Sequence, residues 1–401
     1  MSSGKKEQKD SKPKSDKDVL DYDKIHKGLV NVVVDESSIS SIDGYAGKLY
    51  YRGFAISTLI ENSNFEEVAY LLLFGKLPTQ FELEFFREKL ASERELPDRI
   101  LMILQSFPRR TTRIELLRTA ISALSLYDPD DYDYSRAANV RKGMRIIAKI
   151  PTILAYSHRI KGNMPLIEPD KTLSHAANFY YMMTGKQPDE DIENAFDMLL
   201  MLQAEHTINA STFSARVTAS TLSDIYSAVV SAIGTLRGPL HGGANEAVIN
   251  YLLNEVKTLD DALPWVKKKF SNGEKIMGFG HRVYKTIDPR AKILRKTAKK
   301  FWDKIMETNP NDVNLYKIGE TIETYMAEEK GLTPNVDFYS AILLHALGVP
   351  TLLYTPLFAA SRSIGWVTHA IEQLENNKLI RPRLRYTGEI DRDYIPIAKR
   401  W

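Results

Sequence analysis

Asp337 is the acidic residue whose position is best suited to proton transfer. It follows a Thr-Pro pair at 333–334 that stops the preceding segment, and it opens an apolar run at 338–347 with helical spacing. The carboxylate is therefore expected in or beside the first turn of a mostly buried helix. There it could cap free backbone N–H groups and complement the helix dipole. With histidine partners it could instead act as a general base.

Two histidines lie in glycine-rich segments that would let a ligand approach the backbone closely. His241 is surrounded by three glycines within 238–243, an irregular loop that opens directly into a helix. His281 follows Gly278 and Gly280, which are not a dinucleotide fingerprint because no strand precedes them. Both histidines could bind a ligand, or both could be hydrogen-bonded residues of structural loops.

Three arginines could bind an anion. Arg290 lies at the expected start of a helix over 289–307, where the helix dipole disfavours a cation unless an anionic ligand compensates for it. Arg362 lies inside an apolar, small-residue helix expected over 355–376, so it needs a carboxylate from the protein or from a substrate. Arg381 belongs to a short charge run, which is either solvated surface or a contact with another subunit.

His206 lies between an expected helix end and a polar loop, where a structural role and a ligand contact both remain open. No set of histidines and carboxylates has the spacing of metal ligands, and the histidines lie among arginines that would repel a cation. We therefore expect no metal. The absence of a Gly-x-Ser-x-Gly elbow argues against serine hydrolase chemistry.

Composition is typical of an ordinary globular protein, with 43% hydrophobic and 26% charged residues in 401. Residues 1–18 hold six lysines against four acidic residues, which accounts for +2 of the net charge of +3. This tail is expected to be disordered, and the near-neutral remainder gives no support to nucleic-acid binding. The chain has no apolar run of membrane-spanning length, no secretory signal and no cysteine, which together favour a cytoplasmic protein.

Helical periodicity dominates the elements that must position these residues, so the fold class is predicted to be all-α. The exception is one small β-hairpin, whose second strand is expected at 49–53 after turns at 43–44 and 47. A capping-box pattern joins Thr79 to Glu82, and a single long helix is expected over 211–234. The glycine-rich stretches are the places where hinges are expected.

These segments, in this order, resemble the citrate synthase family. The resemblance rests on the motifs at 238–246, 278–285 and 288–291, followed by Asp337 and Arg362, and it runs from about residue 28 to the C-terminus. It is greatest to the compact archaeal and Gram-positive-type dimeric enzymes. The resemblance implies an all-α homodimer. Each subunit would have a large helical domain, over 19–243 and 351–401, and a smaller inserted helical domain over 244–350.

The resemblance also implies a role for each candidate residue. Asp337 would take a proton from the methyl group of acetyl-CoA, His241 would hydrogen-bond the thioester oxygen, and His281 would polarise the ketone of oxaloacetate. Oxaloacetate would be bound by His206, Arg290, Arg362 and, from the partner subunit, Arg381. CoA would meet the run Glu274, Lys275, Ile276, Met277 and Gly278. No cofactor or metal would be needed.

The implied reaction is the condensation of acetyl-CoA with oxaloacetate and water to give citrate and CoA. A 2-methylcitrate synthase acting on propionyl-CoA would use the same residues, because one methylene changes binding by only roughly 1–3 kcal/mol. A CoA-thioester-binding paralogue without catalysis is the remaining alternative, although every catalytic position holds the expected residue.

Overall fold

The computed structural model describes residues 25–400 of the chain, so the predicted disordered tail at 1–18 lies outside the described residues. The described residues fall into two compact units. Ser37–Ile380 forms the larger unit, and the smaller unit comprises 25–36 and 381–400. Every candidate site residue except Arg381 belongs to the larger unit.

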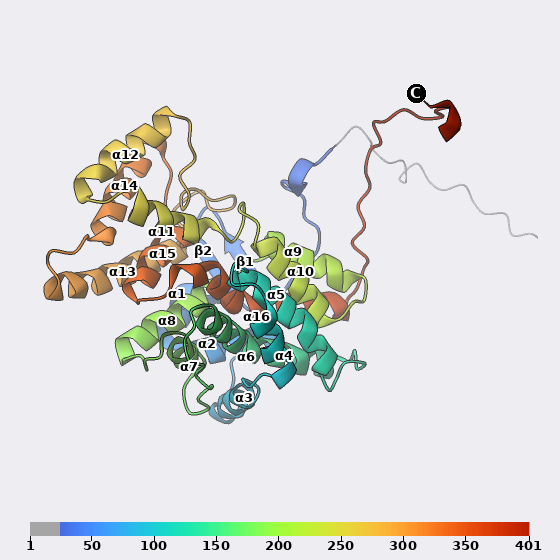
Figure 1. Cartoon of the computed structure of the whole chain (residues 1–401), viewed down its shortest axis with the longest axis horizontal. Coiled ribbons are helices and arrows are strands. Elements are labelled where there is room, and N and C mark those ends of the chain that lie inside the picture. Colours follow the sequence, from blue (N-terminus) through green and yellow to red (C-terminus); the bar gives the residue numbers. More distant parts are fainter. Residues whose placement is uncertain (1–24, 401) are drawn as a thin grey trace, which may run out of the picture. The chain divides into compact units, whose positions relative to one another are not determined.

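Helices dominate the described chain, as the helical periodicity predicted (Figure 1). Their bounds are α1 (Ile56–Asn62), α2 (Phe65–Phe74), α3 (Gln80–Ser92), α4 (Asp98–Ser106), α5 (Arg113–Leu124), α6 (Arg136–Lys161), α7 (His175–Thr184), α8 (Glu190–Gln203), α9 (Ala210–Ser220), α10 (Ile225–Leu236), α11 (Ala244–Asn254), α12 (Leu259–Ser271), α13 (Pro289–Thr308), α14 (Leu315–Lys330), α15 (Val336–Ala346) and α16 (Tyr354–Glu375). Short 3-10 turns lie at Lys27–Leu29, Ser125–Tyr127, Thr351–Leu353 and Ile397–Lys399.

The single helix predicted over 211–234 is wrong, because the chain breaks there into α9 and α10. Leu222, two residues after the end of α9, has a φ of 65°, a left-handed conformation that a leucine rarely adopts. Asp224 then caps α10, with its carboxylate accepting from the amide of Ser227 at 2.9 Å. The break lets α9 fold back and pack against α10.

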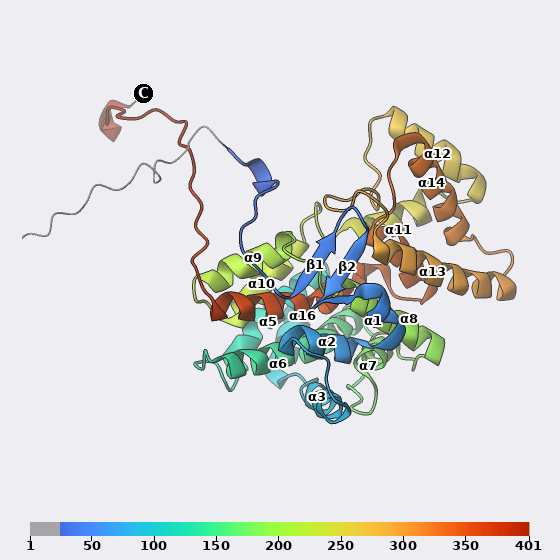
Figure 2. The same cartoon turned by 180° about the vertical axis from the view of Figure 1, so that it is seen from behind.

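The predicted hairpin is confirmed by the strands β1 (Ser40–Asp43) and β2 (Lys48–Tyr51), which pair in antiparallel fashion. Figure 2 looks onto both strands. The carboxylate of Asp43 accepts from the amides of Tyr45 and Ala46, at 3.0 and 2.8 Å, and so fixes the turn between them. A third strand, β3 (Phe54–Ala55), was not predicted because two residues carry no periodicity.

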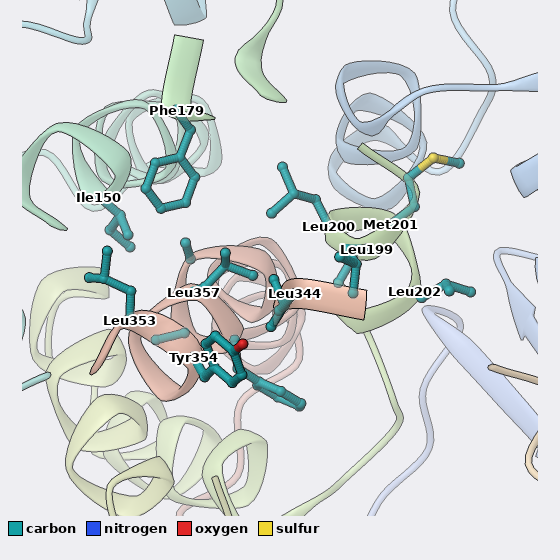
Figure 3. Packing of buried hydrophobic residues seen from close by; sticks show 14 of the residues in the cluster. Ile150, Phe179, Leu199, Leu200, Met201, Leu202, Leu344, Leu353, Tyr354 and Leu357 are labelled. Carbon is teal, nitrogen blue, oxygen red and sulfur yellow. The ribbon is translucent and has the colours of Figure 1, made fainter. Parts of the chain in front are cut away.

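Helix α16 is the central element of the core and packs against α2, α6, α8, α9 and α10. Figure 3 shows Leu353, Tyr354 and Leu357, at its start, among the buried side chains Ile150, Phe179 and Leu199 of neighbouring helices. Most of the length of α16 is buried, so its charged residue Arg362 is kept away from water.

Helices α11 to α15 lie together on one side of the larger unit (Figure 1). Within this group α13 and α11 pack against α15, and α12 packs against α14. The group spans the predicted small domain at 244–350, and the division of Ser37–Ile380 into two domains stays a prediction. Within residues 25–400 no helix is both long and apolar enough to cross a membrane.

Candidate active site

Asp337 does not cap its helix. Asn335 is the N-cap residue of α15, and its side chain accepts from the backbone N–H of Asp337 at 3.0 Å. The Oδ1 atom of Asp337 is buried and has no hydrogen-bond partner among the described residues. The capping interpretation is therefore wrong, and the carboxylate is left free for chemistry.

Burial raises the pKa of Asp337 to about 7. The positive charges of Arg290 and Arg362 lower the pKa, whereas the carboxylate of Asp288 raises it. A carboxylate whose pKa lies near 7 is a much stronger base than an ordinary aspartate, and about half of it is ionised at pH 7. Both arginines lie close enough to act on it.

Two loop segments tie Asp337 to His281. Segments 278–280 and 333–335 pair through an isolated antiparallel bridge. The amides of Gly280 and Asn335 each donate to a carbonyl of the opposite segment at 2.9 Å. The glycine-rich loop and the segment before α15 are thus joined by hydrogen bonds. His281 directly follows the first segment, and Asp337 lies two residues after the second.

His281 has a defined tautomer. Its Nδ1 atom accepts from the backbone amides of Val283 and Tyr284, at 3.0 and 3.2 Å. Because an amide can only donate, Nδ1 carries no proton and Nε2–H is the donor. Burial, with the charge of Arg290 adding to it, lowers the pKa of His281 to about 4. The ring is a neutral hydrogen-bond donor at neutral pH.

His206 is buried beside His281, with the two ring centroids 5.2 Å apart in an edge-on arrangement. Its Nε2 atom lies 3.3 Å from the hydroxyl of Tyr284, which is itself buried. Burial lowers the pKa of His206 well below its usual range, and the charges of Arg290 and Arg362 lower it further. This ring is therefore also neutral.

His241 is held by Ser211, a residue that was not predicted. The backbone amide of Ser211 points at His241 Nε2 at 3.3 Å, and its hydroxyl lies 2.8 Å from the same atom. Nε2 must accept from the amide, so the ring proton is on Nδ1. The indole of Trp366 donates to the same hydroxyl at 3.1 Å. Burial and then the charge of Arg362 lower the pKa of His241 to about 4.

Arg362 is 1% exposed and forms no ion pair among residues 25–400, although the buried carboxylate of Glu205 acts on its charge from farther away. Its Nε donates to the carbonyl of Gln203 at 2.7 Å, and its guanidinium lies 4.9 Å from the ring centroid of Phe358. Burial lowers its pKa to about 10, so it remains charged. The sequence predicted a carboxylate partner for Arg362 from either the protein or a substrate. The described part of the protein places none in direct contact with it.

Arg290 is compensated by the protein itself. Asp288 caps α13 and binds the Arg290 guanidinium through both oxygens, at 3.0 and 2.8 Å. Burial opposes the charge of Arg290, but the ion pair more than offsets it and raises the pKa. The sequence argument that only an anionic ligand makes this position tolerable is corrected, because Asp288 already supplies an anion.

The predicted CoA-binding run borders a cavity of about 350 Å³. Its lining residues are Ala247, Asn250, Tyr251, Asn254, Glu255, Trp265, Lys269, Lys275, Ile276 and Met277. Glu274 is exposed and pairs with Lys269 at 2.8 Å, and Gly278 is buried in the bridged segment. The run therefore has an exposed, charged start and a buried, irregular end.

Arg381 is exposed and lies in the smaller unit, so its predicted role stays a prediction. Over residues 25–400 no group of three or more histidines and carboxylates could hold a metal ion. Sequence reasoning missed four residues that position the site, namely Ser211, Tyr284, Asp288 and Asn335. Of these, Asp288 had a local signal, because an Asp-Pro pair is typical of a helix start.

The family described as citrate synthase, C-terminal domain, matches residues 28–383. The chain belongs to the citrate synthase family. Citrate synthase from Haloferax volcanii is 48% identical over 94% of this chain and 99% of its own. The citrate/2-methylcitrate synthase of Bacillus subtilis is 43% identical over 90% of this chain and 96% of its own. An archaeal and a Bacillus protein are thus among the relatives.

Solved citrate synthases share the fold. The crystal structure of the Thermotoga maritima enzyme has a TM-score of 0.83 and 44% identity, covering 94% of this chain and 99% of its own. The Thermoplasma acidophilum enzyme, solved in a ternary complex with carboxymethyl coenzyme A and oxaloacetate, has a TM-score of 0.88 and 34% identity. That comparison covers 94% of this chain and 100% of the other. The predicted all-α citrate synthase fold is confirmed.

Proposed function

We propose that this chain condenses acetyl-CoA with oxaloacetate and water to give citrate and CoA. The observation that carries the proposal is the environment of Asp337, a carboxylate with an unpartnered oxygen and a pKa of about 7. The charges of the buried residues Arg290 and Arg362 act on this carboxylate. The segment before Asp337 is also hydrogen-bonded to the segment before the neutral His281. This arrangement suits removal of a carbon-bound proton beside a bound anion.

In the first step the carboxylate of Asp337 takes a proton from the methyl group of acetyl-CoA. The electron pair of the C–H bond moves into the thioester, whose oxygen gains charge. The Nδ1–H of His241 donates to that oxygen. Because the pKa of His241 is about 4, its ring is already neutral at neutral pH. It therefore stabilises the enolate as a neutral hydrogen-bond donor.

In the second step the enol carbon attacks the ketone carbon of oxaloacetate. The Nε2–H of His281 donates to the ketone oxygen as it becomes an alkoxide. Arg362 binds one carboxylate of oxaloacetate, and Arg290 and His206 contribute further contacts. The alkoxide takes up a proton, which balances the one that Asp337 removed, and gives citryl-CoA. Water then cleaves the thioester of citryl-CoA, which releases CoA and citrate. These residues need no metal or cofactor for any step.

Acetyl-CoA is proposed to meet the run from Glu274 to Gly278. We further propose a cytoplasmic homodimer in which Arg381 reaches the partner's site. Leu384 and Ile397 of the smaller unit are 94% and 75% exposed, and an interface with a partner subunit would cover them. Sedimentation equilibrium measures the assembly, and a monomer at micromolar concentration would contradict the dimer.

The decisive experiment is release of free CoA thiol from acetyl-CoA, with and without oxaloacetate. We expect release only when oxaloacetate is present, because the enolate has no acceptor without it. A folded protein that releases no thiol with acetyl-CoA or propionyl-CoA would overturn the proposal and leave the non-catalytic alternative. Release that does not depend on oxaloacetate would indicate a thioesterase.

The same assay with propionyl-CoA separates citrate from 2-methylcitrate synthesis. The relatives include both kinds of enzyme by name, with 2-methylcitrate synthase 1 of Corynebacterium glutamicum at 39% identity. We expect a higher kcat/KM for acetyl-CoA. A clear preference for propionyl-CoA would assign the alternative function.

The pH dependence of kcat/KM for acetyl-CoA should report one ionisation. Asp337 must be ionised to act as a base, so activity should fall about tenfold per pH unit below a pKa of about 7. His241 and His281 remain neutral at that pH because their pKa values are about 4. A slope of two in log(kcat/KM) between pH 5 and 6.5 would contradict this assignment.

A further inference from the structure

The turn of the N-terminal hairpin touches the loop that carries His281. The amide of Lys285 donates to the carbonyl of Gly44 at 2.8 Å. A Cβ atom on Gly44 would overlap the carbonyl oxygen of Val283, and one on Gly47 would lie 2.8 Å from Cγ2 of Thr286. The backbone of the turn therefore approaches the backbone of segment 283–287 so closely that a side chain at position 44 or 47 would not fit.

This contact holds the same short segment that fixes the ring of His281. The amides of Val283 and Tyr284 point inward to Nδ1 of His281, and the next amide, that of Lys285, points outward to Gly44. Segment 283–285 is thus held between the imidazole on one side and the hairpin turn on the other.

We propose that the β1–β2 turn is a positioning element of the active site, and that Gly44 is its key residue. By holding segment 283–285, the turn keeps two amides directed at Nδ1 of His281, and so keeps Nε2–H directed at the substrate ketone. Through Tyr284 it also sets the hydroxyl that lies 3.3 Å from His206. This inference rests on the proposed function, because it concerns how His281 meets oxaloacetate.

Gly44 is a suitable site for the test, because the close contact with Val283 is the reason for a glycine there and the backbone conformation is not. Its φ is not positive, so alanine fits the backbone conformation of the turn itself. Gly47 is a poorer site, since its φ of 63° would strain any other residue. The effect of Gly44→Ala should therefore be confined to the contact with segment 283–285.

We expect Gly44→Ala to lower kcat by about 10- to 100-fold, since small misplacements of a reacting geometry have effects of this size. The KM for acetyl-CoA should stay within about twofold, because the turn does not touch the CoA-binding run. In infrared spectra the carbonyl stretch of bound oxaloacetate should move back toward its value in water. Tyr45→Ala is the matched control, because Tyr45 lies in the same turn and is 85% exposed.

A folded Gly44→Ala protein with the kcat and carbonyl stretch of the wild type would overturn the inference and leave the proposed function standing. If the wild type itself lacks oxaloacetate-dependent CoA release, the proposed function fails instead. Should Gly44→Ala not fold, hydrogen exchange of the wild type decides. The amide of Lys285 should be protected with oxaloacetate bound, and exchange at the rate of an unstructured chain would contradict the contact.

Discussion

Replacing Asp337 by asparagine is expected to lower kcat by roughly 10²- to 10⁴-fold, which is the range for loss of a general base. Asparagine keeps the size and polarity of the side chain but cannot take a proton. The KM for oxaloacetate should change little, because the groups proposed to bind its carboxylates are arginines and not Asp337. Steady-state kinetics with both substrates measures the effect.

The fold should tolerate this substitution. Burial raises the pKa of Asp337, which means that the folded state disfavours its ionised form, so above pH 7 a neutral asparagine removes an unfavourable charge. We expect the Tm at pH 8 to be no lower than that of the wild type. The matched control is Asp303→Asn, at a surface ion pair with Lys299, which should leave kcat unchanged. Activity of Asp337→Asn within a few-fold of the wild type would show that Asp337 is not the base.

Replacing Arg362 by leucine should mainly damage oxaloacetate binding. Truncating one partner of a buried, hydrogen-bonded charge pair costs about 2–5 kcal/mol, which corresponds to a KM raised roughly 30- to 4,000-fold. No ion pair among residues 25–400 uses Arg362, but its charge helps to keep the buried carboxylate of Glu205 ionised, so some loss of stability should accompany the loss of binding. Calorimetric titration with oxaloacetate measures the loss.

Arg362→Lys separates charge from geometry. Lysine keeps the positive charge but lacks the planar fork that binds a carboxylate through two parallel hydrogen bonds, so its KM should lie between those of the wild type and the leucine variant. The KM for acetyl-CoA at saturating oxaloacetate serves as the internal control. An unchanged KM for oxaloacetate in Arg362→Leu would contradict the carboxylate-binding role.

The sequence predicted those parts of the fold that depend on local signals. Helix α13 begins at the predicted residue 289 and ends one residue beyond 307, and Thr79 and Glu82 form the predicted capping box. The break between α9 and α10 was missed because it depends on a left-handed leucine, a conformation that tertiary packing must impose. Local propensity carries no information about such a residue.

In the site, too, local sequence signals predicted some features, whereas other features depend on tertiary contacts. The residue types and their order indicated which side chains could do chemistry, but their protonation depends on neighbours that are distant in sequence. Ser211 and His241 meet across 30 positions, and the segments that join His281 to Asp337 lie about 55 positions apart. Only the folded chain shows which ring nitrogen carries the proton.

The pairing of segments 278–280 and 333–335 has a consequence for how this chain can vary. Surface loops usually accept insertions and deletions, because nothing depends on their length. Here each segment sets the register of the other, so one added residue in either would displace His281 relative to Asp337 by one position along the bridge. These two loops should therefore be as intolerant of length changes as the core helices, although they have no regular structure of their own.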